Sequence, residues 1–519
     1  MNLDVLIGNA IGRFRDRIAI EDDARCRTFH EVGERTSRLG HALSRLGLTK
    51  GSRIASLQYN SIETLELDLM SARYGYVRTL LNARYAPADI EYSVNHCKAE
   101  VLIFGEAFAD TVAGLRELLP NVRHYVCVGE PCPSWALRYE DVVESGEPAA
   151  PAYEVAETDW HSIYYTSGST GRPKGVVLSQ RNWLVVVRNH LVGPFKNAKE
   201  SDVLLHSAPM SHASGALGLT HFVLGARQRV LPKFDAARVL ALIESEKVTT
   251  AFLAPTMIHM LMNHPEHDRR DKTSLHTVVY GGAPMPVEHL KKAIESWGFV
   301  FVQGYGQWEA PQLVTFLDQE QHRVAVTQGR EHRLASAGRP ILFCRVAIMD
   351  DEGRLLAPGE EGEIVTSGDH QMVGYLDNPE ATAADRHGSW QRSGDIGRID
   401  EDGFVYITDR KKDLIITGGS NVYPREIEET LHRHPLVHEA VVVGIPSEKW
   451  GEQVHALVVP KPGAAFDDDA FLAWCRDQLS TDKRPRSVER LSELPKSPYG
   501  KILRRELRQR YWEGSSRRI

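Results

Sequence analysis

The sequence Tyr165-Thr166-Ser167-Gly168-Ser169-Thr170-Gly171-Arg172-Pro173-Lys174-Gly175 lies between two short apolar runs, residues 162–165 and 176–178. Short apolar runs beside a glycine-rich segment are typical of buried strands. Glycines let the backbone turn its N–H groups toward one point, and hydroxyls and a lysine add donors, so the stretch predicts a phosphate-binding loop. It is not a Walker A loop, because Pro173 stands where that motif needs its second glycine and Gly175 where it needs Ser or Thr.

The alternation of apolar runs and helical patterns continues along most of the chain. Residues 277–280 form an apolar run, residues 287–297 carry apolar side chains at helical spacing, and residues 299–302 form the next run. This order predicts an α/β fold with doubly wound sheets. Near residue 395 the pattern changes to a compact α+β unit of about a hundred residues. We therefore predict a large N-terminal domain over 1–409 and a small C-terminal domain over 410–519, joined by a linker or hinge at the charged run 409–413.

Charge and cysteine content exclude several classes of protein. The 519 residues carry 62 Lys plus Arg and 69 Asp plus Glu, a formal net charge of −7, which argues against nucleic acid as a partner. The six cysteines have neither CxxC nor zinc-ligand spacing and are expected to be reduced thiols. The N-terminus lacks a signal-peptide pattern, and the apolar runs fall short of the ~18 residues that span a bilayer. A cytoplasmic location with no membrane span is expected.

Seven segments, in one order, resemble the AMP-forming adenylating superfamily, which includes acyl-CoA synthetases, firefly-type luciferases and nonribosomal peptide adenylation domains. The segments are TSGSTGRPKG (166–175), YGGAP (280–284), GYGQWE (304–309), SGD (393–395), DRKKD (409–413), GGSNVYP (418–424) and PKSPYGK (495–501). The chain is most similar to a bacterial stand-alone acyl-CoA synthetase. The resemblance implies that a carboxylate attacks the α-phosphate of Mg·ATP to give an acyl-adenylate, from which a thiol displaces AMP.

The resemblance also implies which residues bind ATP and Mg²⁺. It places the nucleotide at Thr166, Ser167, Gly168, Ser169, Thr170, Gly171, Lys174, Gly282, Ala283, Pro284, Gln303, Gly304, Tyr305, Gly306, Asp395, Ile407, Arg410 and Lys501. Thr166 and Glu309 are the expected metal ligands, because a hard cation can be shared between protein oxygens and substrate phosphates. Lys501 is expected to bridge the substrate carboxylate and the α-phosphate. Lys501, Glu309 and Thr166 are therefore the expected catalytic residues.

The acyl site implied by the resemblance has one ionisable side chain, His212, in its 209–215 segment. The expected substrate-binding residues are His212, Ala213, Tyr280, Gly281, Gly306 and Trp308. Amino-acid-activating relatives place an Asp within residues 211–214, and without one a buried substrate ammonium would be costly. Trp308 stands where the family usually has Thr, and we interpret it as a packed wall of the acyl pocket.

The sequence thus predicts an ATP-dependent acyl-CoA ligase for an apolar carboxylic acid, either a medium- or long-chain fatty acid or a bulky cyclic acid. Its expected cofactors are ATP, Mg²⁺ and coenzyme A as co-substrate. The resemblance implies that the small C-terminal domain is mobile, that it rotates about a hinge at Lys412, and that Gly418 and Gly419 line the CoA tunnel. Alternatives are an aryl-acid CoA ligase, an enzyme that loads a separate acyl carrier protein, a luciferase-like oxidase, or a nucleotide-binding regulator without chemistry. Whether the protein forms a homodimer is left open.

Overall fold

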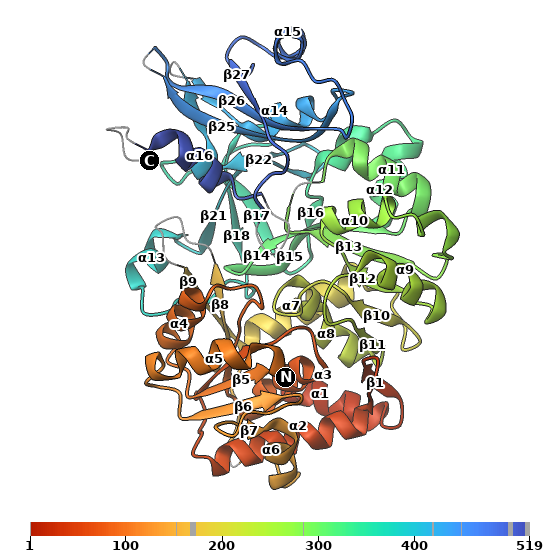
Figure 1. The fold of residues 1–519 in the computed structure, drawn as a ribbon, viewed down its shortest axis with the longest axis vertical. Helices are drawn as coiled ribbons and strands as arrows, with labels where there is room; N and C mark the ends of the chain where they lie inside the picture. The colour runs from red at the N-terminus through yellow and green to blue at the C-terminus, as the bar shows by residue number, and fades with distance from the viewer. Residues whose placement is uncertain are drawn as a thin grey trace.

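Two large sheets, two smaller sheets and the helices around them make up the fold (Figure 1). The computed structural model describes residues 2–151, 153–166, 173–283, 285–417, 420–447, 449–496 and 502–513. Its helices are α1 (Leu3–Arg13), α2 (Phe29–Arg45), α3 (Ile62–Tyr74), α4 (Pro87–His96), α5 (Ala109–Leu115), α6 (Tyr139–Ser145), α7 (Gln180–Val192), α8 (Ala213–Leu224), α9 (Ala236–Ser245), α10 (Pro255–Met262), α11 (Val287–Trp297), α12 (Gln319–Thr327), α13 (Pro379–Ala384), α14 (Pro424–Leu431), α15 (Asp468–Gln478) and α16 (Arg504–Trp512).

The first large sheet holds the strands on both sides of the predicted phosphate loop. Its order is β19 (Gly374–Tyr375), β9 (Lys174–Ser179), β8 (Trp160–Thr166), β4 (Val77–Leu80), β3 (Arg53–Leu57), β5 (Val101–Gly105), β6 (His124–Val128) and β7 (Leu137–Arg138). The strands from β8 to β7 pair in parallel, whereas β8–β9 and β9–β19 are antiparallel. The loop between β8 and β9 therefore joins a hairpin at one side of a parallel sheet.

The second large sheet carries the glycine-rich segments. Its order is β16 (Arg339–Pro340), β15 (Ala310–Leu317), β14 (Phe301–Gln307), β13 (Thr277–Gly281), β12 (Thr250–Phe252), β10 (Val203–His206), β11 (Arg227–Val230), β1 (Ile18–Glu21) and β2 (Cys26–Thr28). The predicted strand–helix–strand unit is present as β13, α11 and β14, and the two strands pair in parallel. The glycines of residues 304–307 lie inside β14, because backbone pairing with β13 and β15 continues through them.

Helices α7 and α8 lie between the two large sheets and join them into one core. The buried cluster there combines Tyr164 and Val176 of the first sheet, Trp183 of α7, Phe222 of α8 and Val230 of the second sheet. Fully buried aromatic and branched side chains of this kind are the main source of folding free energy. Both sheets are consequently held in a fixed relation where their loops meet.

Two smaller sheets follow along the chain. The third contains β17 (Arg345–Met349), β18 (Gly362–Ser367), β21 (Trp390–Ile399), β20 (Arg386–His387) and β22 (Val405–Arg410), all antiparallel. The fourth contains β24 (Ser420–Val422), β23 (Ile415–Thr417), β26 (Gly451–Pro460), β25 (Val437–Ser447) and β27 (Ser487–Arg490). Together with α14, α15 and α16 the fourth sheet forms the smaller unit at the top of Figure 1. The α/β class and the division into a large and a small domain are confirmed, whereas the boundary at 409/410 and the mobility of the small domain stay predictions.

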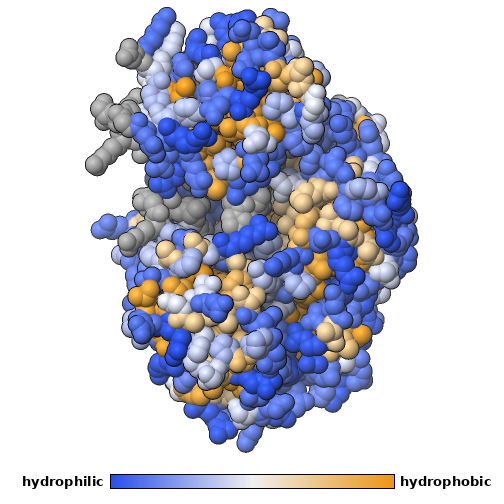
Figure 2. Space-filling model, in the orientation of Figure 1, coloured by the Kyte–Doolittle hydropathy of each residue, from blue (hydrophilic) through white to orange (hydrophobic). Residues whose placement is uncertain are grey.

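Surface and cysteine properties agree with the composition. Each of the six cysteines is a free thiol. Within the ranges described above, no helix has the length and apolarity needed to cross a membrane. Hydrophilic residues cover most of the face in Figure 2, and apolar residues lie between them in separate groups.

Candidate functional site

The hairpin of β8 and β9 positions the two ends of the predicted phosphate loop. Thr166 is the last residue of β8 and pairs across the hairpin with Lys174, the first residue of β9. Hairpin pairing thus brings a hydroxyl and an ammonium to the same end of two strands. Of the predicted loop residues, Ser167, Gly168, Ser169, Thr170 and Gly171 lie outside the described residues.

Glu309 receives two hydroxyl groups from other parts of the chain. Thr166 Oγ1 lies 3.4 Å from Glu309 Oε1, and the Tyr375 hydroxyl lies 3.1 Å from the same oxygen. The Tyr375 hydroxyl is also 2.6 Å from Asp385 Oδ2. Burial raises the pKa of the Glu309 carboxyl above its usual range, because the charged form is poorly solvated there.

A divalent cation fits this arrangement of oxygens. Neighbouring ligands on Mg²⁺ are about 3 Å apart, since each lies 2.0–2.1 Å from the metal. Thr166 Oγ1 and Glu309 Oε1 are 3.4 Å apart, close to that separation. A buried carboxylate whose charged form is disfavoured gains most from a cation. The donor set therefore suits Mg²⁺ bound together with phosphate oxygens.

Lys174 lies against the same group. Its ammonium nitrogen is 4.2 Å from the centre of the Tyr375 ring, a cation–π contact. Tyr375 belongs to β19, which pairs with β9 directly beside Lys174. Strand pairing thus explains why a residue two hundred positions further along the chain touches both the predicted phosphate lysine and the predicted metal ligand.

A second polar group joins the third sheet to β14. Asp395 in β21 pairs with Arg410 in β22, and its Oδ1 lies 3.1 Å from the guanidinium Nε. The hydroxyl of Tyr305, from β14, donates to Asp395 Oδ2 over 2.8 Å. The Asp395 carboxylate raises the pKa of Arg410, and burial raises that of Tyr305, so the guanidinium stays charged and the phenol neutral. An oriented carboxylate of this kind can accept ribose hydroxyls.

Gly281 in β13 and Gly304 in β14 allow a close approach of the two strands. A Cβ on Gly281 would collide with the carbonyl oxygen of Gly304, and a Cβ on Gly304 would collide with Leu313. Next to them, the buried side-chain Oε1 of Gln303 has no hydrogen-bond partner among the described residues. A planar ligand with an amino group, such as adenine, would satisfy that acceptor.

The other residues predicted to bind the nucleotide come from the segments that follow β13 and from β14 and β22. Gly282 has a φ of +76° with open space beside it, which suits a ligand-facing turn. Ala283 follows it and is half-buried, and Gly306 packs against the backbone of β15. Ile407 in β22 accepts a hydrogen bond at its carbonyl from Arg425, 2.9 Å away. Pro284 lies outside the described residues.

Trp308, the residue before Glu309, forms an aromatic wall with Tyr164 and His212. Its ring stacks on Tyr164 with a centroid separation of 3.5 Å and an interplanar angle of 7°. Arg78 donates a hydrogen bond to the Tyr164 hydroxyl oxygen over 2.7 Å, and its guanidinium is ion-paired with Asp68. His212 meets the tryptophan edge-to-face at 5.7 Å. Burial lowers the pKa of His212 to about 4, so the imidazole is neutral near pH 7.

Of the remaining predicted acyl-site residues, Ala213 lies at the start of a helix and Tyr280 has its side chain buried in the core. Ala213 begins α8, and its carbonyl accepts a hydrogen bond from Gln312 over 3.1 Å. The Tyr280 side chain is buried in the core under α11 and α12, where its hydroxyl pairs with His322. A contact of Tyr280 with a substrate would therefore come from its backbone.

The hinge, tunnel and lysine predictions fall at the small domain. Lys412 lies in a 3-10 turn, Lys411–Asp413, directly after β22. Gly418, Gly419 and Lys501 lie outside the described residues. Their roles stay predictions.

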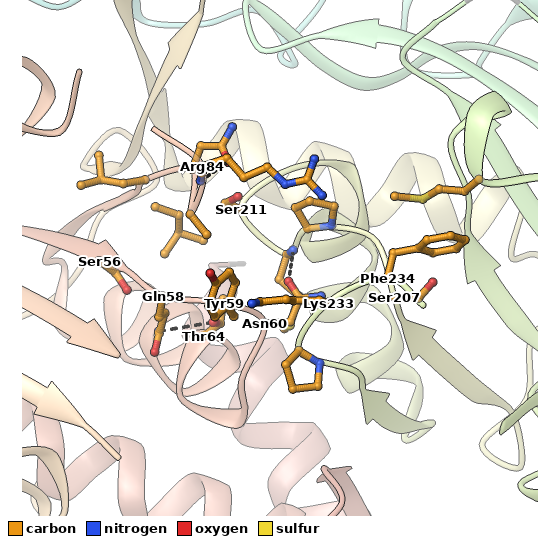
Figure 3. Close-up of a pocket in the computed structure, with 18 residues that line it drawn as sticks. Ser56, Gln58, Tyr59, Asn60, Thr64, Arg84, Ser207, Ser211, Lys233 and Phe234 are labelled. Carbon is orange, nitrogen blue, oxygen red and sulfur yellow. Dashed lines mark hydrogen bonds between the residues drawn. The ribbon is translucent and has the colours of Figure 1, made fainter. Parts of the chain in front are cut away.

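A pocket of about 180 Å³ opens where loops of both large sheets meet (Figure 3). It lies past the carboxyl ends of parallel strands, β3 and β4 in one sheet and β10 and β11 in the other, the usual place for ligands in α/β folds. Arg84 and Lys233 line it, and the Lys233 ammonium lies 3.9 Å over the Tyr59 ring. Ser211, the neighbour of His212, also lines the pocket, which brings it next to the predicted acyl site.

Sequence reasoning did not find Tyr375, Asp385 or this pocket. Tyr375 stands in a short Gly-Tyr strand and Asp385 at the end of α13, and neither belongs to one of the seven segments. Only the pairing of β19 with β9 brings Tyr375 to Glu309. The one signal in the sequence was a tyrosine directly after a glycine in the short apolar run 372–376.

Family models and sequence relatives match this chain over most of its length. Family models described as AMP-binding enzyme and AMP-binding enzyme C-terminal domain match residues 8–376 and 426–501. A medium/long-chain-fatty-acid–CoA ligase of Mycobacterium tuberculosis is 35% identical, covering 94% of this chain and 86% of the relative. A feruloyl-CoA synthase of Amycolatopsis is 36% identical (93% and 94% covered). A fatty acid–[acyl-carrier-protein] ligase of Streptomyces coeruleorubidus is 33% identical (96% and 95% covered).

Two structures of one protein, MatB from Rhodopseudomonas palustris, are similar to this chain. The ATP-bound structure matches with a TM-score of 0.88 at 28% identity, covering 98% of this chain and 99% of that one. The apo structure matches with a TM-score of 0.76 at 27% identity, covering 99% of each chain.

Proposed function

Because this chain belongs to the AMP-binding enzyme family, we propose that it activates an apolar carboxylic acid with Mg·ATP and transfers the acyl group from the adenylate to coenzyme A. At the coarser level the chain is an AMP-forming acyl- or aryl-CoA ligase that uses ATP. The nature of the acid, the role of Mg²⁺ and the choice of CoA over a carrier protein are the parts proposed here.

One strand and the turn after it carry the proposal. In β14 and the two residues after it, Gln303 offers a hydrogen-bond acceptor to adenine, and Tyr305 orients the Asp395 carboxylate that would bind the ribose. Glu309 faces the hydroxyl of Thr166. Trp308, the residue before Glu309, stacks on Tyr164 and forms the wall of the proposed acyl site. A single element therefore aligns base, sugar, phosphate and acid in one order, which is the positioning that phosphoryl and nucleotidyl transfer require.

The chain's own groups supply orientation and charge balance. Asp395, fixed by Arg410 and Tyr305, would hold the ribose so that the α-phosphate faces the acid. Lys174, held over the Tyr375 ring, would balance charge on the outer phosphates. Glu309 and Thr166 would hold Mg²⁺, which supplies neutralisation of phosphate charge when it is bound. Lys501 is proposed to meet the attacking carboxylate, as the family resemblance implies.

An apolar acid fits the surroundings of Trp308. Tyr164 is uncharged, and the depressed pKa of His212 keeps that ring neutral near pH 7. A substrate ammonium placed beside them would lose its hydration without gaining a carboxylate partner. The relatives are named for fatty acids and for ferulic acid, both of which have an apolar body.

Coenzyme A is the acceptor that the pocket in Figure 3 favours. Arg84 and Lys233 supply positive charge for phosphate groups, and Ser211 links the pocket to His212. Coenzyme A carries more phosphate than the pantetheine arm of a carrier protein, so two cations suit it better. A carrier protein is the alternative acceptor, because one relative is named as an acyl-carrier-protein ligase.

The test is an assay of protein, Mg·ATP, a panel of carboxylic acids, and either CoA, dephospho-CoA or a phosphopantetheinylated carrier protein. AMP release together with a thioester mass for an apolar acid and CoA is the expected result. Glu309→Gln and Lys501→Ala should lose adenylation, while Lys501→Ala keeps thioester formation from supplied acyl-adenylate. Thioester on the carrier alone would replace CoA as the acceptor, and equal AMP release by wild type and Lys501→Ala would refute the proposed chemistry.

A further inference from the structure

Tyr375 joins three side chains that come from separate elements. Its hydroxyl lies between Glu309 Oε1, 3.1 Å away, and Asp385 Oδ2, 2.6 Å away. Its ring lies under the Lys174 ammonium at 4.2 Å. The tyrosine is buried, so these contacts are made away from bulk water. None of them is required by the packing of β19 alone.

The backbone around Tyr375 is held firmly. Tyr375 pairs with Val176 in β9, and its N–H donates to the Thr382 hydroxyl over 2.9 Å. Thr382 belongs to α13, which begins with an Asn378 side-chain cap and ends at Asp385. The Asp385 carbonyl in turn accepts the N–H of Arg392 in β21 over 2.8 Å. The phenol oxygen therefore has a fixed place relative to the hairpin.

A phenol has one hydrogen to donate, and here two carboxylates compete for it. The shorter contact, to Asp385, fixes the hydroxyl and the ring to which it belongs. The hydroxyl is thereby held within hydrogen-bond distance of Glu309 Oε1, to which it donates when its hydrogen is turned away from Asp385. Thr166 approaches the same carboxylate oxygen, Oε1, at 3.4 Å. The described hydroxyls thus gather on Oε1, the carboxylate oxygen whose separation from Thr166 Oγ1 suits a cation held by both residues.

We propose that Tyr375, oriented by Asp385, is a positioning residue that presets the Glu309 carboxylate for a divalent cation bound with the nucleotide. A glutamate side chain that must be ordered on binding loses conformational entropy at that moment, and a preset side chain does not. Groups that orient metal ligands in this way change metal affinity by about 10- to 100-fold when they are removed. The inference rests on the proposed role of Glu309 as a cation ligand.

The first test separates the hydroxyl from the ring. Tyr375→Phe keeps the ring under Lys174 and removes the bond to Glu309, and we expect its Mn²⁺ affinity, measured by EPR with a non-hydrolysable ATP analogue, to fall at least 10-fold. The Mg²⁺ concentration for half-maximal adenylation should rise by the same factor, while thioester formation from supplied acyl-adenylate stays unchanged. Tyr125→Phe is the matched control, because it removes a hydroxyl bonded to the Arg116 carbonyl in another part of the fold.

A double-mutant cycle tests the role of Asp385. Asp385→Ala should change the Mn²⁺ affinity in the wild-type background, because it removes both the anchor of the Tyr375 hydroxyl and the competitor for its hydrogen. It should add nothing in the Tyr375→Phe background, because it acts through the same hydroxyl. Unchanged Mn²⁺ affinity in Tyr375→Phe, or full additivity of the two changes, would overturn the proposal. Should Tyr375→Phe fail to fold by circular dichroism, Asp385→Ala alone decides it, with unchanged Mn²⁺ affinity counting against.

The same measurement distinguishes this inference from the proposed function. Glu309→Gln should abolish nucleotide-dependent Mn²⁺ binding if Glu309 is the cation ligand. If Glu309→Gln binds Mn²⁺ like wild type, the proposed role of Glu309 fails and the positioning role fails with it. If Glu309→Gln loses Mn²⁺ and Tyr375→Phe does not, only the positioning role of Tyr375 is refuted.

Discussion

At Asp395 one buried carboxylate is bound from two sides, by the Arg410 guanidinium at 3.1 Å and by the Tyr305 hydroxyl at 2.8 Å. Both donors come from strands that the backbone holds rigidly, β22 and β14. Fixed partners of this kind make the carboxylate a preset acceptor rather than a floating charge. The residue scale is therefore where a single substitution has its sharpest effect.

Asp395→Asn should lower kcat/KM for adenylation by about 10- to 100-fold, since a hydrogen bond to a charged group is worth about 1.5–3 kcal/mol. Both half-reactions should fall, because both use an adenosine group. Steady-state adenylation and thioester formation from supplied adenylate would be compared. Asp400→Asn, in the turn after β21, is the control, and a loss of equal size there would remove the special role of Asp395.

Trp308→Ala should shift acid preference toward bulkier acyl groups. Its stack on Tyr164 contributes about 0.5–1.5 kcal/mol beyond simple burial, and the vacated space lies beside His212. Ratios of kcat/KM across acids of increasing width, together with the melting temperature, measure the two consequences. Trp308→Phe should fall between wild type and Trp308→Ala, and an unaltered acid profile in both variants would remove Trp308 from the acyl wall.

Residues named from sequence segments come together when their contacts are local or lie in paired strands of one motif. Thr166 and Lys174 face each other across one hairpin, and Asp395 and Arg410 across another. Tyr375 could not be predicted in this way, because its contact with Glu309 depends on the pairing of β19 with β9. The register of that distant pair is set by tertiary packing and has no sequence motif of its own.

At the scale of elements, helix α7 shows how a secondary-structure signal also serves the site. Ser179 and Asn182 form a reciprocal capping box at its start. The Asn182 amide also donates to the carbonyls of Asp369 and Gln371, both at 2.8 Å. These carbonyls lie in the segment that leads to β19, so the helix start anchors the approach to Tyr375.

Asn182→Ala should destabilise the protein by about 2–3 kcal/mol, because it removes the Asn182 half of the capping box and the donor to two partly buried carbonyls. Ser179→Ala removes the cap alone and should cost about 1 kcal/mol. Thermal and urea unfolding of both variants give the comparison. Equal losses would mean that the bonds to residues 369 and 371 add nothing to stability.

Helices and strands were predicted well where periodicity and end signals agreed. The helix predicted over 287–297 has those bounds as α11. The strand predicted over 299–302 instead runs from Phe301 to Gln307 as β14, because its glycines pair with β13 and β15. Glycine in a sequence indicates a turn, but two flanking strands can supply enough hydrogen bonds to keep it extended.

At the scale of the whole molecule, the order of strands could not be predicted. The α/β class follows from alternating patterns, but the N-terminal strands complete the second large sheet, because β1 pairs with β11 and β2 pairs with β1. Such pairings join residues some two hundred positions apart and depend on total burial rather than on local sequence. The contact of the small domain with α10 and α11 is equally non-local.

Four histidines form that contact. His259 of α10 lies 5.4 Å from His438 of β25 between ring centres, and His289 of α11 lies 6.0 Å from His432 after α14. His259 and His289 stack on each other at 5.5 Å. Lys292 and Lys496 add positive charge near His259, and Glu439 opposes them. Burial is the main cause that lowers the pKa of His259, His432 and His289, the last to about 4.

This cluster predicts that acid loosens the small domain. A histidine whose pKa is lower in the docked arrangement takes up a proton on undocking, so docking is fully favoured above the free pKa of about 6.5 and weakens as the pH falls toward about 4. Small-angle X-ray scattering between pH 8 and pH 5 should show a rising radius of gyration while circular dichroism stays native. The variant His259→Gln/His289→Gln should flatten that rise, because its side chains stay neutral. An equal rise in wild type and variant would show that other groups drive the change.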